Sequence, residues 1–320
     1  MDNYLGFRNA LNNGLRTFSV DTRFDDYRIK QNGELANSLS MHYRFLTFSY
    51  TFVPKFIPGN VDDERKGNSS SSLFHMDLIF SRLVQELSYD RTRGFYLVNT
   101  DEYVPDWDPD QDAFIRFPDL VVQEVKGFTG YKFDRRLSLQ ALASQTQVQL
   151  RSAGSFFPGL NYRYYKIEDR TPLTGNNSTQ TSDNIEVLLV PGYVHTFVFA
   201  KRCYASIAAF FGGGVIHTDL LTRQPTGDLR TRSSNVMGRG EVRSALGYNR
   251  EHFFAGGRIR WSDQWFDQDG QNAVIQHEQL VFEVFLGFRI KAPGFMRSSV
   301  DMIERKRDEF LDKVTEPPGR

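Results

Sequence analysis

The fold is decided by the stretch LVFEVFLGFR, residues 280–289, in which apolar residues recur at every second position. Side chains of a β-strand point alternately to its two faces, so this period predicts a strand with one continuous apolar face and a second face that carries Glu283 and Arg289. The same period recurs in the stretches 46–53, 74–81, 160–165 and 253–262, and less regularly in 17–29, 36–44, 84–97, 121–133, 137–150, 187–200, 203–217 and 236–248. The sequence therefore predicts an all-β protein.

The expected strands are long, and their two faces differ strongly. Several exceed the ~5–6 residues typical of globular strands and the ~9–11 residues that cross a bilayer. In a soluble sandwich such apolar faces pack inward, whereas in a transmembrane barrel they face lipid around a polar lumen. The candidate lumen-facing charged residues are Arg239, Glu241, Arg243, Arg258, Arg260, Glu283 and Arg289. These charges fit a solvated face of a soluble sheet equally well, so both interpretations stay open.

The connections between the strands favour a barrel. Short turns are expected near residues 44–45, 82, 134–136, 201–202 and 249–251, and long polar loops at 58–71, 99–118, 169–184 and 222–235. Short turns at one rim and long loops at the other are typical of outer-membrane barrels. The pattern gives thirteen segments, but single-chain bacterial barrels have an even number, so we expect about twelve strands in a closed antiparallel transmembrane barrel. The barrel is expected over 15–292, after an N-terminal extension at 1–14.

The end of the chain, residues 293–320, has a different pattern. Pro293-Gly294 ends the last strand, and Val300, Ile303, Phe310 and Val314 follow at roughly helical spacing. A short amphipathic helix is expected at 299–314. A solvated helix that packs only weakly is expected first, and the alternatives are a helix that lies under the barrel, rests on the membrane surface or binds an envelope protein partner.

Composition excludes several classes of protein. The chain has 320 residues, 39 basic and 39 acidic side chains and therefore no net charge, so nucleic acid is not an expected partner. Mean hydropathy is −0.46, and no stretch has the ~18 consecutive apolar residues of a membrane helix. The single cysteine, Cys203, excludes an internal disulfide and a cysteine-based zinc site.

The first residues conflict with the strand pattern over localisation. Residues 1–14 have no basic start, no apolar core and no small-residue cleavage site, so they do not form a signal peptide. Taken alone they predict a cytoplasmic protein. The strand pattern instead predicts a protein of the outer membrane, in contact with its lipid, whose export signal is missing from this sequence.

Four runs resemble a bacterial family of unknown function whose members are predicted outer-membrane β-barrels of Gram-negative envelopes. They are YRFLTFSYTF (43–52), RSAGSFFPGLNYRYYKI (151–167), VPGYVHTFVFAKRCY (190–204) and RSALGYNREHFFAGGRIRW (243–261). The resemblance covers roughly residues 15–291. It implies export, an outer-membrane location and a closed antiparallel barrel, but it implies no reaction and offers no catalytic residues to carry over.

Two local patterns could carry chemistry of their own. Asp106, Asp108 and Asp110 alternate within DWDPDQD (106–112) like the start of a calcium loop, although Gln111 stands where that loop has glycine, so an acidic surface loop is the alternative. The run Gly212-Gly213-Gly214 has no lysine or helix after it, so it predicts a bulge or a close approach of another backbone rather than a phosphate loop. No cofactor is expected.

The sequence leaves three functions open. The first is a passive narrow pore or an envelope scaffold, which is not an enzyme. The second is a membrane-embedded hydrolase, with His217 beside Asp219 or Ser262 beside Asp263, although no GxSxG motif is present. The third is a soluble barrel that binds a small apolar ligand. The orientation of four apolar side chains distinguishes the membrane hypotheses from the soluble one: Phe48, Phe253, Phe282 and Leu286.

Overall fold

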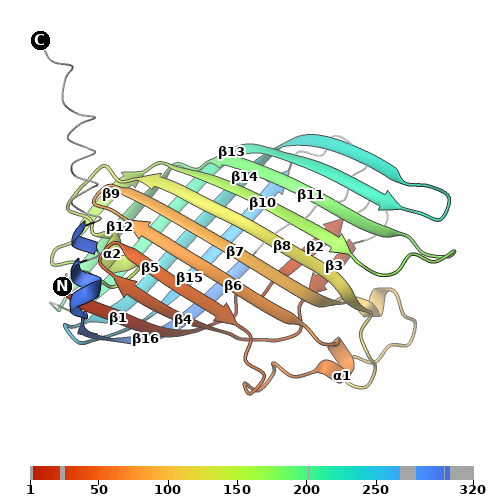
Figure 1. The fold of residues 1–320 in the computed structure, drawn as a ribbon, viewed down its shortest axis with the longest axis horizontal. Helices are drawn as coiled ribbons and strands as arrows, with labels where there is room; N and C mark the ends of the chain where they lie inside the picture. Colours follow the sequence, from red (N-terminus) through yellow and green to blue (C-terminus); the bar gives the residue numbers. More distant parts are fainter. Residues whose placement is uncertain (1–2, 22–25, 201, 267–278, 299, 303–320) are drawn as a thin grey trace, which may run out of the picture.

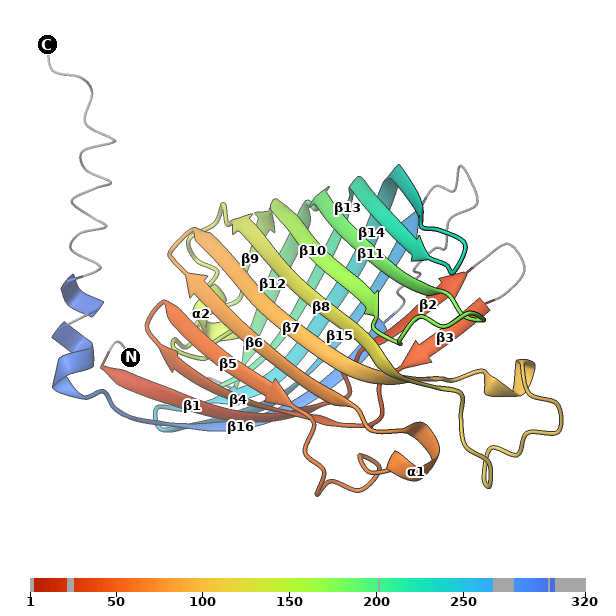
Figure 2. The ribbon, with the colours of Figure 1, turned by 45° about the vertical axis from the view of Figure 1, so that its right-hand side comes forward.

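A computed structural model of the chain describes residues 3–21, 26–200, 202–266, 279–298 and 300–302. Antiparallel strands curl into a closed barrel (Figures 1 and 2), with a ring of 12 strands as expected. The ring consists of β1 (Tyr4–Asn12), β4 (Ala36–Tyr43), β5 (Leu46–Phe52), β6 (Ser70–Ile79), β7 (Leu83–Leu97), β8 (Arg116–Tyr131), β10 (Gly159–Asp169), β11 (Thr179–Leu189), β13 (Cys203–Arg223), β14 (Leu229–Asn249), β15 (Phe253–Phe266) and β16 (Gln279–Lys291). Pairing of β1 with β16 and of β11 with β13 closes the ring.

Two of the ring strands are interrupted by proline. Strand β9 (Ala153–Phe157) continues into β10 across Pro158, and β11 continues into β12 (Gly192–Phe199) across Pro191. Proline has no N–H to donate to a ladder, so each strand breaks at this residue. The N-terminal half of β13, residues 203–210, pairs with β12, and its C-terminal half, residues 213–223, pairs with β11.

Residues 4–12, expected to belong to an N-terminal extension at 1–14, form a strand of the barrel. Strand β1 pairs with β16 from Tyr4↔Lys291 onward and with β4 on its other side, and it thereby supplies the closing strand. Its alternation is hidden in the sequence because Arg8 points inward while Asn9, a polar residue, points outward beside it.

The segment expected as a strand at 17–29 contains two short strands outside the ring, β2 (Thr17–Asp21) and β3 (Asp26–Lys30), which pair with each other. Among the described residues, this hairpin pairs with β7 through Ile29↔Leu97 and Lys30↔Tyr96. Apolar residues of the hairpin pack on the inner faces of β7 and β8, where they form a buried cluster of Phe18, Ile29, Phe95, Leu97, Leu120 and Val122. The hairpin therefore narrows one mouth of the barrel.

Residues 137–150 are not a strand, and 134–136 is not a short turn. The whole connection 132–152, here called the plug segment, runs from β8 to β9 and contains one helical turn, α2 (Leu139–Leu142). Its alternation of polar and apolar residues resembles that of a strand. However, Leu137 is fully buried and the glutamines bond to carbonyl groups rather than lie on a solvated face.

The loops follow the expected division between two rims, with one exception. Turns at 44–45, 80–82 and 250–252 share a rim with the plug segment, and α1 (Asp63–Lys66) and η1 (Thr100–Glu102) lie in loops of the opposite rim (Figure 1). The expected loop at 222–235 is instead mostly strand. There β13 and β14 continue as a ribbon that β11 flanks on the β13 side, and Asp219 on β13 pairs with Arg230 and Arg232 on β14.

The barrel wall is uneven in height. Strands β4 and β5 have 8 and 7 residues, whereas β13 and β14 have 21 each. Figure 1 shows β13 and β14 running well past the ends of β4 and β5 toward the loop rim.

The expected tail helix is present in part. Residues 294–298 and 300–302 are helical, beginning earlier than expected, and the rest of the expected helix lies outside the described residues. Met296 and Val300 pack against the rim cluster of Leu5, Tyr43 and Ala292. No helix within the described parts of the chain has the length and apolar character needed to cross a membrane.

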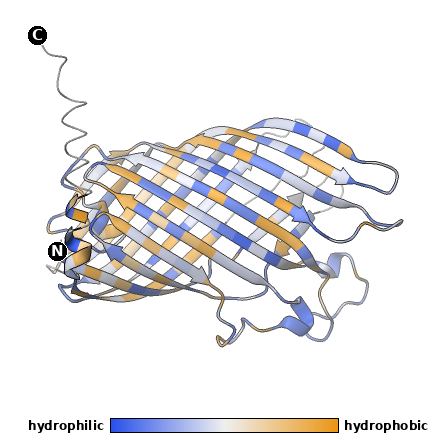
Figure 3. Ribbon diagram, in the orientation of Figure 1, coloured by the Kyte–Doolittle hydropathy of each residue, from blue (hydrophilic) through white to orange (hydrophobic). Residues whose placement is uncertain are grey.

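The apolar faces of the strands point outward. Phe48 and Phe253 are each 46 % exposed, Phe282 is 48 % exposed and Leu286 is 57 % exposed. Figure 3 shows apolar and polar residues alternating along the strands. This is the arrangement of a transmembrane barrel, and the soluble barrel with an inward aromatic face is therefore wrong.

The run Gly212-Gly213-Gly214 lies where β13 changes its partner from β12 to β11. A Cβ atom on Gly214 would lie 1.9 Å from the carbonyl oxygen of Val187, and one on Gly212 equally close to that of Leu189. The expected close backbone approach is present, because no side chain fits between these strands.

We expect Leu286→Arg to destabilise the barrel in lipid vesicles by about 2–4 kcal/mol, because a guanidinium would face hydrocarbon. Urea unfolding in vesicles measures this change. The control is Leu229→Arg at the tip of the β13–β14 ribbon, where the side chain is 59 % exposed and which should leave stability unchanged. Equal stability of both variants would contradict the membrane orientation.

We also expect Gly214→Ala to cost about 1–3 kcal/mol of stability in detergent, because β11 must move to admit the methyl group. The matched variant is Gly213→Ala, whose Cβ would meet Met237 O at 3.3 Å. Unfolding curves that show the Gly213 variant to be the weaker one would refute the close-approach explanation.

Candidate functional site

The inner face of the barrel carries charged side chains at the positions between the outward apolar residues. All seven charged residues singled out from the sequence lie on this inner face of β14, β15 and β16: Arg239, Glu241, Arg243, Arg258, Arg260, Glu283 and Arg289. They form two groups, one around Glu241 and one around Glu283, while Arg289 binds the plug segment.

Four of the strongest inner ion pairs involve residues that the sequence did not single out. Arg163 on β10 donates from Nε to Glu186 at 2.8 Å and also bonds that carboxylate through Nη2. Its Nη1 lies 3.6 Å from Glu124, which also accepts from Arg16 at 3.3 Å. Arg16, from the chain before β2, reaches Asp90 at 2.7 Å. The signal was present at 160–165, where Arg163 shares an inner face with Asn161 and Tyr165.

Side chains reach across the lumen as well as along the wall. Arg163 Nη2 donates to Gln264 Oε1 at 3.4 Å, which joins β10 to β15, strands that are not neighbours in the ring. Glu186 is 1 % exposed, so this part of the interior is a packed ionic core.

The group around Glu241 contains more cations than anions. Arg239 Nη2 donates to Glu241 Oε2 at 2.8 Å, and Arg243 Nε donates to Oε1. Arg260 faces Arg243 directly across the β14–β15 ladder. The guanidinium of Arg243 also lies over the Phe210 ring at 5.3 Å.

The group around Glu283 is closer to neutral. Its carboxylate lies 3.5 Å from Arg258 Nη1 and 3.7 Å from Arg8 Nη1. Both guanidiniums lie over the face of Phe285, at 4.9 and 5.5 Å from the ring centre.

Arg258 of this group, together with Arg289, holds the plug segment inside the barrel. Arg258 Nη2 donates to the carbonyls of Leu142 at 2.7 Å and Ala143 at 2.9 Å. Arg289 donates to the carbonyl of Gln145 and, at 2.7 Å, to the side chain of Asn249. The carbonyls at the C-terminal end of α2 therefore accept hydrogen bonds from an arginine of the barrel wall.

Polar side chains of the plug segment complete this attachment. Gln140 donates to Ile79 O at 2.9 Å, and Gln145 donates to the Tyr204 hydroxyl at 2.7 Å. Thr146 donates to Arg44 O at 3.0 Å. The plug segment thus lies in the turn-side mouth, where these side-chain hydrogen bonds hold it to the wall.

The Arg44 turn links the plug segment to the tail helix. The carbonyl of Arg44 accepts a hydrogen bond from Thr146, and the guanidinium of Arg44 lies 2.6 Å from the carboxylate of Asp301 in the helical tail. One short turn therefore contacts both the segment that fills the mouth and the helix outside it.

The base of the plug segment is an exposed ion pair at the rim. Asp134 accepts from Arg136, and this hydrogen bonding lowers the pKa of the Asp134 carboxyl to about 2. Burial lowers the pKa of the neighbouring Lys132, whose ammonium donates to Leu137 O.

The expected hydrolase pairs are not assembled. His217 Nδ1 lies 2.9 Å from Ser234 Oγ on the outer face of the ribbon, while Asp219 is bound by Arg230 and not by the histidine. Ser262 is buried on the inner face, and alternation places Asp263 on the opposite face.

A second histidine contact lies in the lumen, where His75 Nε2 is 2.5 Å from Asp77 Oδ1. In register on either side of His75 are Ser49 and Ser88, but no hydrogen bond joins either serine to the ring among the described contacts.

The acidic loop at 106–112 bonds to itself. The Asp108 N–H donates to Asp112 Oδ2 at 2.9 Å, and the Asp110 N–H donates to Asp108 Oδ1 at 2.8 Å. Asp106 has a positive φ of 60° at this turn. Within the part of the chain that the structure describes, no three histidine, cysteine or acidic side chains gather as a metal site.

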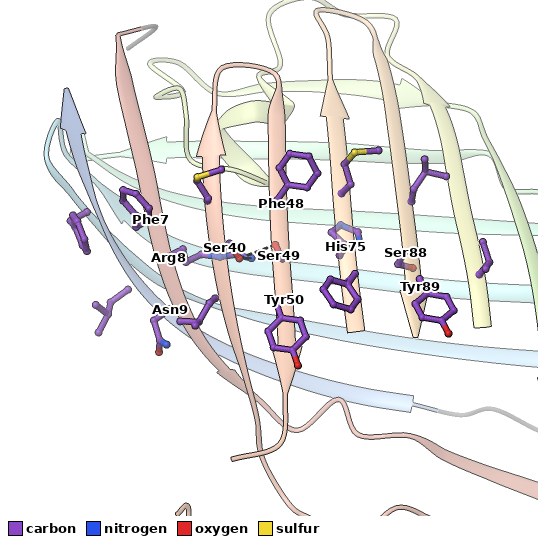
Figure 4. Close-up of a pocket in the computed structure, with 18 residues that line it drawn as sticks. Phe7, Arg8, Asn9, Ser40, Phe48, Ser49, Tyr50, His75, Ser88 and Tyr89 are labelled. Atoms are coloured by element: carbon purple, nitrogen blue, oxygen red, sulfur yellow. Dashed lines mark hydrogen bonds between the residues drawn. The ribbon is translucent and has the colours of Figure 1, made fainter. Parts of the chain in front are cut away.

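The outer wall contains an apolar hollow of about 830 Å³ (Figure 4). Figure 4 shows Phe48 and Tyr50 of β5 beside Phe7 of β1 and Tyr89 of β7 on this face. The inner positions behind it carry small side chains such as Ser40, Ser49 and Ser88. The hollow lies on the lipid-facing surface, and its lining also includes Arg8 and His75, whose side chains point inward.

The comparisons with known proteins concern the fold alone. A family model described as "Domain of unknown function (DUF4421)" matches residues 2–289. No curated protein sequence matches the chain. Among solved structures, the outer membrane protease OmpT from Escherichia coli superposes with a TM-score of 0.46 at 8 % identity, covering 91 % of this chain and 98 % of that one. The β domain of the Bordetella autotransporter BrkA gives 0.36 at 11 % identity, covering 91 % and 100 %. Scores this low support no transfer of function.

We expect Arg163→Ala to destabilise the barrel by about 3–5 kcal/mol, because Glu186 would remain buried without its partner. The control, Arg136→Ala, removes one partner of the exposed Asp134 pair, where the arginine is 84 % exposed, and should change stability by less than about 1 kcal/mol. Urea unfolding in detergent measures both. A similar loss in the two variants would contradict the assignment of Arg163 to a buried core.

Proposed function

This chain belongs to the family described as Domain of unknown function (DUF4421). We propose that it is an outer-membrane barrel of a Gram-negative envelope and that its lumen is a narrow solute pore. In this conformation the plug segment closes the pore. The outward apolar belt supports the membrane location. The short turns lie at the same rim as the first residue of β1 and the last residue of β16. This arrangement supports the usual orientation of such barrels, with the short turns on the periplasmic side.

The observation that carries the pore proposal is how the plug segment is attached. Hydrogen bonds that involve a charged group contribute about 1.5–3 kcal/mol each, and those from Arg258 and Arg289 hold the plug segment without any strand ladder. Such a segment can leave the mouth while all ring strands stay paired. A permanent structural filling would not need so separable an attachment.

The lumen beyond the plug segment retains access to water. Lys126 and Arg243 both lie on inner faces, yet their side chains are 49 % and 41 % exposed. Hydrated charged groups along the interior are what a pathway for small polar solutes requires.

An envelope scaffold is the alternative, and a protein partner for the tail helix stays a prediction. The described part of that helix contacts its own barrel through Met296, Val300 and Asp301, so a partner would have to bind its other face or displace it. A hydrolase requires a nucleophile, a base and an orienting group together, and His217 with Ser234 lacks the third.

Deletion of residues 137–149 tests the pore. The ends of the segment are already joined, because the Phe133 N–H donates to Phe156 O at 3.4 Å and the Asp134 N–H to Ser155 Oγ at 2.9 Å. We expect the wild-type protein to be closed in planar bilayers with rare openings, and the deletion variant to conduct steadily.

A double variant, Arg258→Ala with Arg289→Ala, should open more often than the wild type because the plug segment loses its charged donors. Arg230→Ala, which removes an exposed arginine from the ribbon at the opposite rim, is the control and should behave as the wild type. A deletion variant that folds, as judged by heat-modifiable migration on gels, but never conducts would overturn the pore and favour the scaffold.

A further inference from the structure

Two arginines of the lumen face each other without a carboxylate between them. Arg243 on β14 and Arg260 on β15 are directly opposite in the antiparallel ladder, and both point inward. Side chains in such a pair lie about 4.5–5.5 Å apart at Cβ, and like charges there are destabilising. The pairing needs a compensating anion.

The protein supplies only part of that compensation. Glu241 accepts from Arg239 at one oxygen and from Arg243 at the other, and among the described contacts no hydrogen bond joins it to Arg260. Across the described residues, Arg260 forms no ion pair and donates no hydrogen bond. Its neighbour on the β16 side is the apolar Val281.

These arginines also have hydrogen-bond donors that the protein does not satisfy. The Nε atoms of Arg239 and Arg260 are both buried without a hydrogen-bond partner. The space bordered by Arg239, Glu241 and Arg243 on the β13 side has a volume of about 10 Å³, which suits at most a single water molecule. A larger group can reach the guanidiniums only from the lumen, where Arg243 is 41 % exposed.

The chemistry of these donors defines the ligand class. A guanidinium offers paired N–H groups in a planar fork that fits two oxygens of a phosphate, sulfate or carboxylate. Besides Glu241, the carboxylate of Glu86 on β7 attracts both Arg243 and Arg260. Three guanidiniums against these two carboxylates leave a local charge of about +1, which a single oxyanion offsets and a neutral solute does not.

We propose that Arg243 and Arg260, flanked by Arg239, form a binding site in the lumen for a compact oxyanion. Binding itself does not depend on the proposed pore. The role of the site in selecting anionic solutes does rest on that function.

Inorganic phosphate is the probe, compared with chloride at equal ionic strength, and thermal unfolding in detergent is the readout. The test variant is Arg260→Gln. The matched control is Arg135→Gln, which removes the same charge from an exposed rim position. We expect phosphate to raise the melting temperature of the wild type and of the control, and to bind Arg260→Gln at least tenfold more weakly by titration calorimetry.

Without phosphate, Arg260→Gln should unfold at the same temperature as the wild type or higher, because it removes one of two opposed charges. Arg260→Lys retains the charge but not the fork and should show intermediate affinity. Equal phosphate affinity in the wild type and Arg260→Gln, or no phosphate effect on the wild type, would overturn the site.

Conductance separates the two proposals. In the 137–149 deletion variant, reversal potentials should show a preference for anions that Arg260→Gln reduces. If phosphate binds but the deletion variant does not conduct, the pore fails and the site stands. If the deletion variant conducts and Arg260→Gln binds phosphate like the wild type, the site fails and the pore stands.

Discussion

The structure depends on one requirement: no backbone polar group of the wall can be left unpaired in hydrocarbon. Each unpaired N–H or carbonyl there costs several kcal/mol, so the sheet has no tolerable edge and must close on itself. Pairing of Tyr4–Asn12 with the last strand achieves this closure. The alternation of apolar and polar residues follows, because a closed wall has one face in lipid and one around the lumen.

The interior meets the same requirement by different means. Where strands cannot pair, arginine side chains take the place of the ladder and donate to carbonyls, as Arg258 and Arg289 do for the plug segment. Elsewhere the charges pair with one another, as Arg163 does with Glu186. A lumen built in this way is ordered by ionic contacts that can be exchanged for water or solute, whereas the wall around it cannot change without opening the ring.

Much of the barrel could be predicted from the sequence, because period two in stretches such as 280–289 reports the pleat directly. The errors have a common cause, since alternation alone does not say what covers each face. Residues 137–150 alternate but lie inside the barrel, and Tyr4–Asn12 is a strand whose outward Asn9 hides the pattern. The inner charges on β14 to β16 could be identified from the sequence. The partners of Arg163 and the position of Arg243 opposite Arg260 could not, because they depend on the register between strands.

The unequal wall has a consequence for the surrounding bilayer. Strand β5, with 7 residues at about 3.3 Å each, spans roughly 23 Å along its length and less once tilted, whereas β13 with 21 residues is three times as long. Lipid beside β4 and β5 must thin to match a short hydrophobic surface, and lipid beside β13 need not. The protein therefore imposes a gradient of thickness around its circumference, with the thinnest annulus next to the apolar hollow.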